Sequence, residues 1–203
     1  MSRLRWIAVV MLVGFEAGVS VLMLTPKVSA DYADYYISRS TRCWPRPVTG
    51  RYQLGETVSL RDDASGRAAI RHKQCGWVPP FVEGSWSIGD RASLRFSFVP
   101  PDHGVFIALD ARAFIADSHP QQRVGVMVNG ETLNALLFTP ETQGFTVISV
   151  PPEVAALDPT GLTLRFDFPD RISPKDLGMG DDTRQLGILV SELVIEALPK
   201  SQK

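Results

Sequence analysis

Short stretches in which apolar and polar residues alternate restrict the fold of this 203-residue chain more than any other feature. In residues 92–99 the apolar side chains of Leu94, Phe96 and Phe98 would share one face, with polar residues between them. A period of two is typical of a β-strand with one buried face. Further strands are predicted at residues 57–61, 68–72, 105–115, 123–128, 133–138, 145–150, 162–168 and 188–195.

Turn-forming residues separate these stretches. Residues 62–66 and 100–104 are rich in Asp, Gly and Pro, and Asn129-Gly130 is a strong signal for a two-residue hairpin turn. Residues 154–157 could form one helical turn, but no long helical period follows the N-terminus. Many short strands with turns between them predict an all-β fold, an antiparallel two-sheet sandwich of jelly-roll-like type.

The N-terminal segment predicts export. Arg3 and Arg5 precede an apolar run at residues 6–24, which has about the ~20 residues of a membrane-spanning helix. Small residues at Val28-Ser29-Ala30 fit a signal-peptidase site. Two interpretations stay open: an uncleaved anchor that leaves a periplasmic domain on the inner membrane, or a periplasmic or secreted protein cleaved after Ala30. The run at 6–24 is therefore the expected membrane contact.

The resulting domain organisation has four parts: a signal peptide or anchor at 1–30, an irregular lead-in at 31–50, a β-sandwich at 51–198 and a polar tail at 199–203. Cys43 and Cys75 are the only cysteines. An isolated pair in an exported protein is more often a disulfide than two free thiols, so we expect these two to be bonded.

Charge and composition exclude some functions. The formal net charge is −1 and no basic run occurs, which excludes a general nucleic-acid binder. His72, His103 and His119 are scattered beside turns, so no metal site and no cofactor are expected. No catalytic motif is recognisable, and the chain is interpreted as non-catalytic. Only a glycosidase built on carboxylates gathered by the fold, from Glu83, Asp102 and Asp182, stays open.

Two groups of residues are candidates for ligand binding. Trp77 and Trp86 flank Glu83, and tryptophan rings can stack on the apolar faces of sugars. Asp182 and Arg184 lie two positions apart before a strand and could bracket a polar ligand. The competing interpretations are that both tryptophans are core aromatics and that the Asp–Arg pair only fixes its own loop.

In order along residues 50–197, a series of short motifs resembles a largely uncharacterised β-sandwich module of bacterial polysaccharide and cell-envelope proteins. That module often lies C-terminal to membrane glycosyltransferase-like or phosphoglycerol-transferase-like regions. The resembling residues are Tyr52-x-Leu54-Gly55-x-x-Val58, Gly76-Trp77, Glu83-x-x-Trp86-Ser87-x-Gly89-x-x-Ala92-x-Leu94, Pro120-x-Gln122-Arg123-Val124-x-Val126-x-Val128-Asn129-Gly130, Ser173-Pro174-x-x-Leu177-Gly178 and Asp182-x-Arg184-x-Leu186-Gly187.

The chain departs from that module at one loop, where residues 78–82 intervene between the Gly-Trp pair and Glu83 and a cysteine precedes Gly76. The resemblance implies a setting in the cell envelope more than a chemistry. Together with the export signal, the strand pattern and the pair Trp77 and Trp86, it predicts an extracytoplasmic, carbohydrate-binding-like accessory module in envelope polysaccharide biosynthesis, with a glycan or a membrane glycosyltransferase as partner. Two alternatives are a structural or assembly subunit that docks on a membrane glycosyltransferase, and a glycan-active enzyme.

Overall fold

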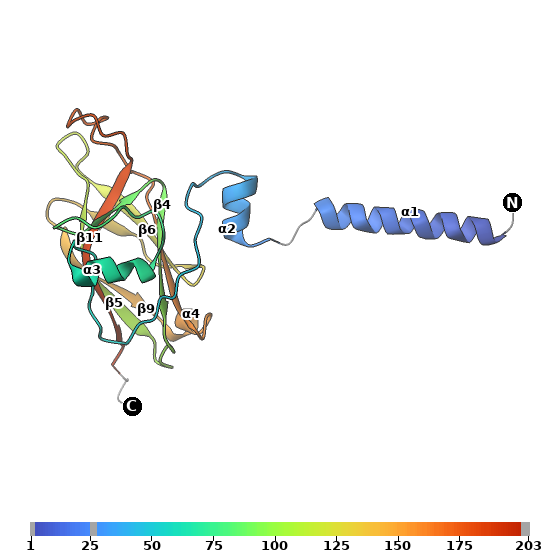
Figure 1. Cartoon of the computed structure of the whole chain (residues 1–203), viewed down its shortest axis with the longest axis horizontal. Helices are drawn as coiled ribbons and strands as arrows, with labels where there is room; N and C mark the ends of the chain where they lie inside the picture. The colour runs from blue at the N-terminus through green and yellow to red at the C-terminus, as the bar shows by residue number, and fades with distance from the viewer. Residues whose placement is uncertain (1–2, 25–27, 200–203) are drawn as a thin grey trace. The chain divides into compact units, whose positions relative to one another are not determined.

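The protein is described by a computed structural model that covers residues 3–24 and 28–199. The chain divides into two compact units, with the boundary between Arg39 and Ser40. The first unit holds helix α1 (Arg3–Leu24), the short helix α2 (Ala30–Tyr32) and a π-helical turn, η1 (Ala33–Ile37) (Figure 1).

Helix α1 forms where the sequence predicts one. Among residues 3–24 and 28–199, however, no helix combines the length and the apolarity that crossing a membrane requires. This finding does not support the membrane anchor, and cleavage after Ala30 stays a prediction. Residues 200–203 of the predicted polar tail lie outside the described part of the chain.

The lead-in is not irregular throughout, because residues 30–37 are helical. Tyr32 and Tyr36 lie one helical turn apart, and their ring centroids are 4.8 Å from each other. The ring of Tyr35 also packs against Tyr36 at 4.8 Å. These aromatic contacts give a short segment a local reason to be helical that apolar periodicity does not reveal.

The second unit contains two sheets, and all pairings between their named strands are antiparallel. The first sheet has the order β1 (Val58–Ser59), β11 (Leu186–Ala197), β5 (Val105–Ala113), β9 (Gly144–Val150), and β3 (Ser85–Ile88) also pairs with β11. The second has the order β2 (Lys73–Cys75), β4 (Arg91–Ser97), β10 (Gly161–Asp167), β6 (Gln122–Val128), β7 (Glu131–Thr132), and β8 (Leu136–Phe138) also pairs with β6.

The pairings nest inside one another along the chain. β6 pairs with β8, β5 with β9, β4 with β10 and β3 with β11. The chain thus folds back on itself like one long hairpin whose successive strand pairs alternate between the two sheets. This nesting is characteristic of a jelly roll, and the predicted antiparallel two-sheet sandwich is confirmed.

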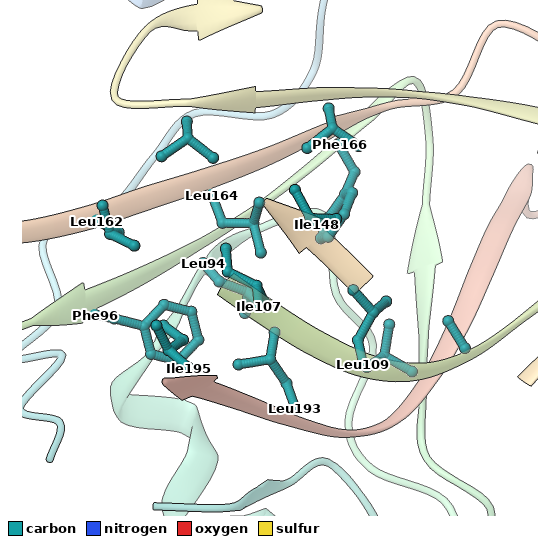
Figure 2. Packing of buried hydrophobic residues seen from close by; sticks show 14 of the residues in the cluster. Leu94, Phe96, Ile107, Leu109, Ile148, Leu162, Leu164, Phe166, Leu193 and Ile195 are labelled. Carbon is teal, nitrogen blue, oxygen red and sulfur yellow. The ribbon is translucent and has the colours of Figure 1, made fainter. Parts of the chain in front are cut away.

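The core lies between the two sheets. Phe96 on β4 and Leu164 and Phe166 on β10 face Ile107 on β5 and Ile195 on β11, and all five are fully buried (Figure 2). Each alternates with a more exposed neighbour along its strand, as the period of two predicts. Burying a side chain of this size stabilises the folded state by about 1.5–3 kcal/mol, so the alternating strands supply most of the driving force.

The prediction of a strand at residues 68–72 is wrong. Residues 64–71 form the short helix α3 (Ala64–Ala68) followed by a 3-10 turn, η2 (Ala69–Arg71). The Asp63 side chain caps this helix, since its Oδ1 accepts a hydrogen bond from the backbone N–H of Gly66 at 2.6 Å. The acidic residues that indicate a turn therefore start a helix here.

The turn at Asn129-Gly130 is confirmed. Asn129 and Gly130 have φ values of +51° and +88°, the left-handed conformations of a type I′ hairpin turn, and Val128 pairs with Glu131 across it. The Asn129 Oδ1 accepts a hydrogen bond from the backbone N–H of Thr163 at 2.9 Å, which ties the turn to β10. The predicted helical turn is also present as α4 (Pro152–Ala155).

The expected disulfide joins Cys43 to Cys75, with 5.3 Å between their Cα atoms. It links the segment before the sandwich to β2, directly ahead of the loop that leads to β3. The bond therefore holds that loop at one end.

Because the disulfide closes a loop with a sequence separation of 32, we expect the Cys43→Ser/Cys75→Ser variant to lose about 3–4 kcal/mol of unfolding free energy. Urea unfolding followed by tryptophan fluorescence measures the loss. The control is the reduced wild-type protein, which should unfold at the same urea concentration as the variant. Equal unfolding midpoints for the oxidised protein and the variant would contradict the prediction.

Candidate functional site

A cavity of about 400 Å³ opens on the outer side of the first sheet, where β3 meets the start of β11. Ile188 and Val190 of β11 point into the core, whereas Leu189 between them points away from it. In register, Leu189 lies opposite Trp86 of β3 and Arg112 of β5. The cavity is lined by Phe81, Val82, Glu83, Trp86, Asp182, Arg184, Leu186 and Leu189, and is called the Trp86 cavity below.

The position of Trp86 follows from the alternation along β3. Ser85 and Ser87 are buried on the inner side, and the Ser87 Oγ accepts a hydrogen bond from the backbone N–H of Ile188 at 2.8 Å. Trp86 is directed outward and is half-buried. Its ring meets that of Phe114 edge to face, with centroids 5.8 Å apart. The indole is thus held in place while it borders the cavity.

The cavity has an apolar floor and an apolar rim. Leu186 and Leu189 are buried at the floor, and Phe81 and Val82 stand at the rim, where Val82 is 81% exposed. Gly187 lies between the two leucines on the opposite side of β11. A Cβ there would meet Cδ1 of Phe168 at 2.5 Å and Oγ of Ser87 at 2.7 Å, so only glycine lets β11 approach the core this closely.

Two ion pairs border the cavity. The Glu83 Oε2 lies 3.0 Å from Nη2 of Arg112. The Arg184 Nε lies 3.0 Å from each carboxylate oxygen of Asp182, and the Arg184 backbone N–H donates to Asp182 Oδ1 at 2.9 Å. The guanidinium hydrogen bonds lower the pKa of Asp182 to about 2, so this carboxylate stays ionised at any physiological pH.

Four of the five residues predicted to bind a ligand meet in this cavity: Glu83, Trp86, Asp182 and Arg184. The fifth, Trp77, lines a different cavity and packs partly against the core. Its indole Nε1 donates to the backbone oxygen of Ser93 at 3.1 Å, and its ring lies edge-on to Phe166. The core interpretation thus describes the packing of Trp77 better than that of Trp86.

Sequence reasoning missed the apolar members of the Trp86 cavity, namely Phe81, Val82, Leu186 and Leu189, and the partner cation Arg112. Phe81 and Val82 carried a usable signal, because two adjacent apolar residues in a loop between turn residues have no core strand to join. Arg112 carried none, since its contact with Glu83 depends on the register of β5 and β11.

The histidines and the remaining candidate carboxylate lie elsewhere. His72 is buried, its ring stacks on Phe96 at 4.8 Å and burial lowers its pKa, so it belongs to the core. Asp102 lies in the turn before β5, whose first residue pairs with the last residue of β11 at the end remote from the cavity. Across residues 3–24 and 28–199, no group of three or more His, Cys, Asp or Glu side chains is placed to hold a metal ion.

No model of a known protein family matches the chain, and no curated protein matches it. Solved structures with some similarity include a family 36 carbohydrate-binding module (CBM36-1) of a multidomain xylanase from the hindgut metagenome of Trinervitermes trinervoides. It is 14% identical, with a TM-score of 0.42, and the match covers 71% of this chain and 98% of that one.

Two further matches are of the same kind. A CBM36 carbohydrate-binding module solved in complex with calcium and xylotriose is 14% identical, with a TM-score of 0.37 and coverage of 58% of this chain and 82% of that one. A family 35 module from Clostridium thermocellum is 16% identical, with a TM-score of 0.36 and coverage of 72% and 91%. With TM-scores below 0.5, none of these likenesses assigns a ligand to this chain.

The Asp182–Arg184 pair gives a pH-dependent prediction. Because the pKa of Asp182 is lowered in the folded protein, the ion pair stabilises the fold above the ordinary carboxylate pKa, and this contribution is lost as the pH falls through about 2. We expect Arg184→Gln to return the pKa of Asp182 toward about 3.9, as measured by carboxyl carbon NMR.

Asp170 is the internal control. Hydrogen bonds from Arg123 also hold its pKa at about 2, and Arg184→Gln leaves those bonds intact. The pKa of Asp170 should therefore stay the same in the variant. A pKa of Asp182 that also stays near 2 would show that the guanidinium is not its cause.

Proposed function

We propose that the chain is a non-catalytic carbohydrate-binding module whose glycan lies in the Trp86 cavity. The observation that carries the proposal is the convergence of Trp86, Glu83, Asp182 and Arg184 around one apolar floor, from two segments about 100 residues apart in sequence. The volume of about 400 Å³ lies within the range of small-molecule sites.

The chemistry of the lining suits a sugar. A pyranose ring has an apolar face of C–H groups, which can pack on the indole of Trp86 and on the rim formed by Phe81 and Val82. Its hydroxyl groups need donors and acceptors at the edge of that contact. The carboxylates of Glu83 and Asp182 accept hydrogen bonds, and the guanidinium of Arg184, whose side chain is half exposed, has further N–H groups to donate.

The same cavity also places two carboxylates, Glu83 and Asp182, beside the proposed sugar, which is the arrangement behind the alternative of a glycan-active enzyme. Hydrolysis requires one of the two to be protonated so that it can act as a general acid. Arg184 instead keeps Asp182 ionised, and Glu83 forms an ion pair with Arg112. These pairings favour recognition of hydroxyl groups over proton transfer to a glycosidic oxygen.

We extend the proposal to the cellular setting: an extracytoplasmic module, periplasmic or secreted, that acts in envelope polysaccharide biosynthesis. The disulfide between Cys43 and Cys75 supports an oxidising compartment, and the charged and apolar N-terminal sequence supports export. A subunit that docks on a membrane glycosyltransferase is the competing role, and co-purification from native membranes tests it.

Trp86→Ala tests the proposed site. We expect this variant to lose at least about tenfold in affinity for the glycans that the wild-type protein binds on an array, because it removes the stacking surface. Isothermal titration with the best array ligand measures the loss, and the reaction mixtures are assayed for cleaved glycan at the same time.

Phe145→Ala is the matched control, since Phe145 is an aromatic residue on β9 that is 74% exposed and lies outside the cavity. Its affinity should equal that of the wild-type protein. Folded Trp86→Ala protein that binds glycan with unchanged affinity would reject the site, and cleavage that Glu83→Gln abolishes would replace the binding proposal with the enzymatic one.

A further inference from the structure

A second and larger cavity, of about 530 Å³, opens at the edge of the sandwich beside β2. It shares no lining residue with the Trp86 cavity. It is called the Lys73 cavity here and is lined by Arg46, Gly66, Arg67, Ile70, Lys73, Gln74, Cys75, Trp77, Val78, Pro79 and Pro80. Three of these residues are cationic and none is acidic.

Lys73 is the unusual member of this lining because it is only 5% exposed. Its Nζ donates to Oγ of Ser85 at 2.5 Å and to the backbone oxygen of Val78 at 3.3 Å. Both acceptors are uncharged, and an ammonium group has a third N–H. Within residues 3–24 and 28–199, no carboxylate forms an ion pair with it. A buried charge without a counter-ion is costly, so an anion that enters the cavity would be stabilised there.

The neighbouring cations strengthen the same preference. The Arg46 Nε donates to the backbone oxygen of Lys73 at 3.1 Å, which places its guanidinium beside β2. Arg67 stands on α3 at the other side of the lining and pairs at the surface with Asp62. A carboxylate has two oxygens and can accept hydrogen bonds from an ammonium and a guanidinium at once. The planar guanidinium of arginine matches the geometry of a carboxylate.

The remaining wall is apolar. Ile70, Val78, Pro79 and Pro80 offer only hydrocarbon surface, and Ile70 is left 58% exposed at the surface. Trp77 adds to this surface, because its single indole N–H is already donated to Ser93. A ligand that fits this lining has a charged end and an apolar body.

We propose that the Lys73 cavity is a binding site for a small organic carboxylate, whose carboxylate group pairs with Lys73 and Arg46 and whose apolar body packs on Ile70, Val78 and Trp77. This site is separate from the glycan site and does not depend on it. Trp77, which lies outside the Trp86 cavity, lines this one.

Lys73 has a structural role as well, because its hydrogen bond to Ser85 connects the second sheet to β3 of the first. A purely structural lysine would stabilise the fold without making the protein bind carboxylates. Both roles predict that loss of Lys73 destabilises the fold, but only the ligand-binding role predicts that it weakens carboxylate binding. The experiment therefore measures binding.

The experiment is an NMR titration of the whole protein with acetate, butyrate and phenylacetate, using phenylacetamide as the uncharged counterpart of phenylacetate. We expect affinity to rise with the size of the apolar body, phenylacetamide to bind at least about tenfold more weakly, and the amide shifts of Ile70 and Trp77 to respond. Absence of saturable binding by all three carboxylates, or equal binding of the amide, would overturn the proposal.

Lys73→Met should lower the affinity for phenylacetate about tenfold or more. Lys175→Met is the matched control, because it removes an exposed ammonium group outside the cavity and should change nothing. Ile70→Asp is a second variant that places a carboxylate at a largely exposed position and should also lower the affinity, even if Lys73→Met fails to fold. Unchanged affinity in folded Lys73→Met or in Ile70→Asp would reject the site.

A pH series separates the contribution of the Lys73 ammonium to phenylacetate binding from that of the guanidinium groups. Burial and the Arg46 charge lower the pKa of Lys73 to about 8. The other charged side chains in the lining are the guanidinium groups of Arg46 and Arg67. The affinity of phenylacetate should therefore fall about tenfold from pH 7 to pH 9 in the wild-type protein. The affinity should not change over this range in Lys73→Met. An affinity of the wild-type protein that also does not change would exclude Lys73 as the group that binds the carboxylate.

Discussion

The hydrogen bonding of β11 on both of its edges is the constraint on which the rest of the second unit depends. β5 runs along one edge, from Ile188 opposite Ala113 to Ala197 opposite Val105, and β1 and β3 share the other edge. This register fixes Leu189 between Trp86 and Arg112. A slip of one residue would turn the apolar floor of the Trp86 cavity into the core and the core into solvent. The fold and the candidate site therefore share one determinant.

Sequence alone predicts the long strands because their alternation is strong and local. β4, β5, β6, β9, β10 and β11 all appear near the predicted positions. Prediction from sequence fails where a local hydrogen bond, or a partner strand distant in sequence, determines the secondary structure. The Asp63 cap makes a helix of a segment that reads as a strand. β2 and β3 have only three and four residues, and β3 exists because β11, about 100 residues later, pairs with it.

The same limit applies to the site. The residue types were informative, since tryptophan, carboxylate and arginine near turns drew attention to Glu83, Trp86, Asp182 and Arg184, which all line the Trp86 cavity. That they bind a ligand stays a prediction. Their proximity could not be predicted, because it depends on the β3–β11 register. Trp77 and Trp86 are nine positions apart and end in different cavities, since the Trp77 indole is bound to Ser93 on β4 while Trp86 faces outward from β3.

The loop at residues 78–83 borders two cavities that differ in electrostatic character. Val78, Pro79 and Pro80 form a wall of the Lys73 cavity, and Phe81, Val82 and Glu83 border the Trp86 cavity. At the Trp86 cavity each carboxylate forms an ion pair with an arginine, Glu83 with Arg112 and Asp182 with Arg184, so the positive and negative charges are equal in number. In the lining of the Lys73 cavity, every charged residue is cationic. Because the disulfide bonds Cys75, just before this loop, to Cys43, it fixes one end of the segment that borders both cavities.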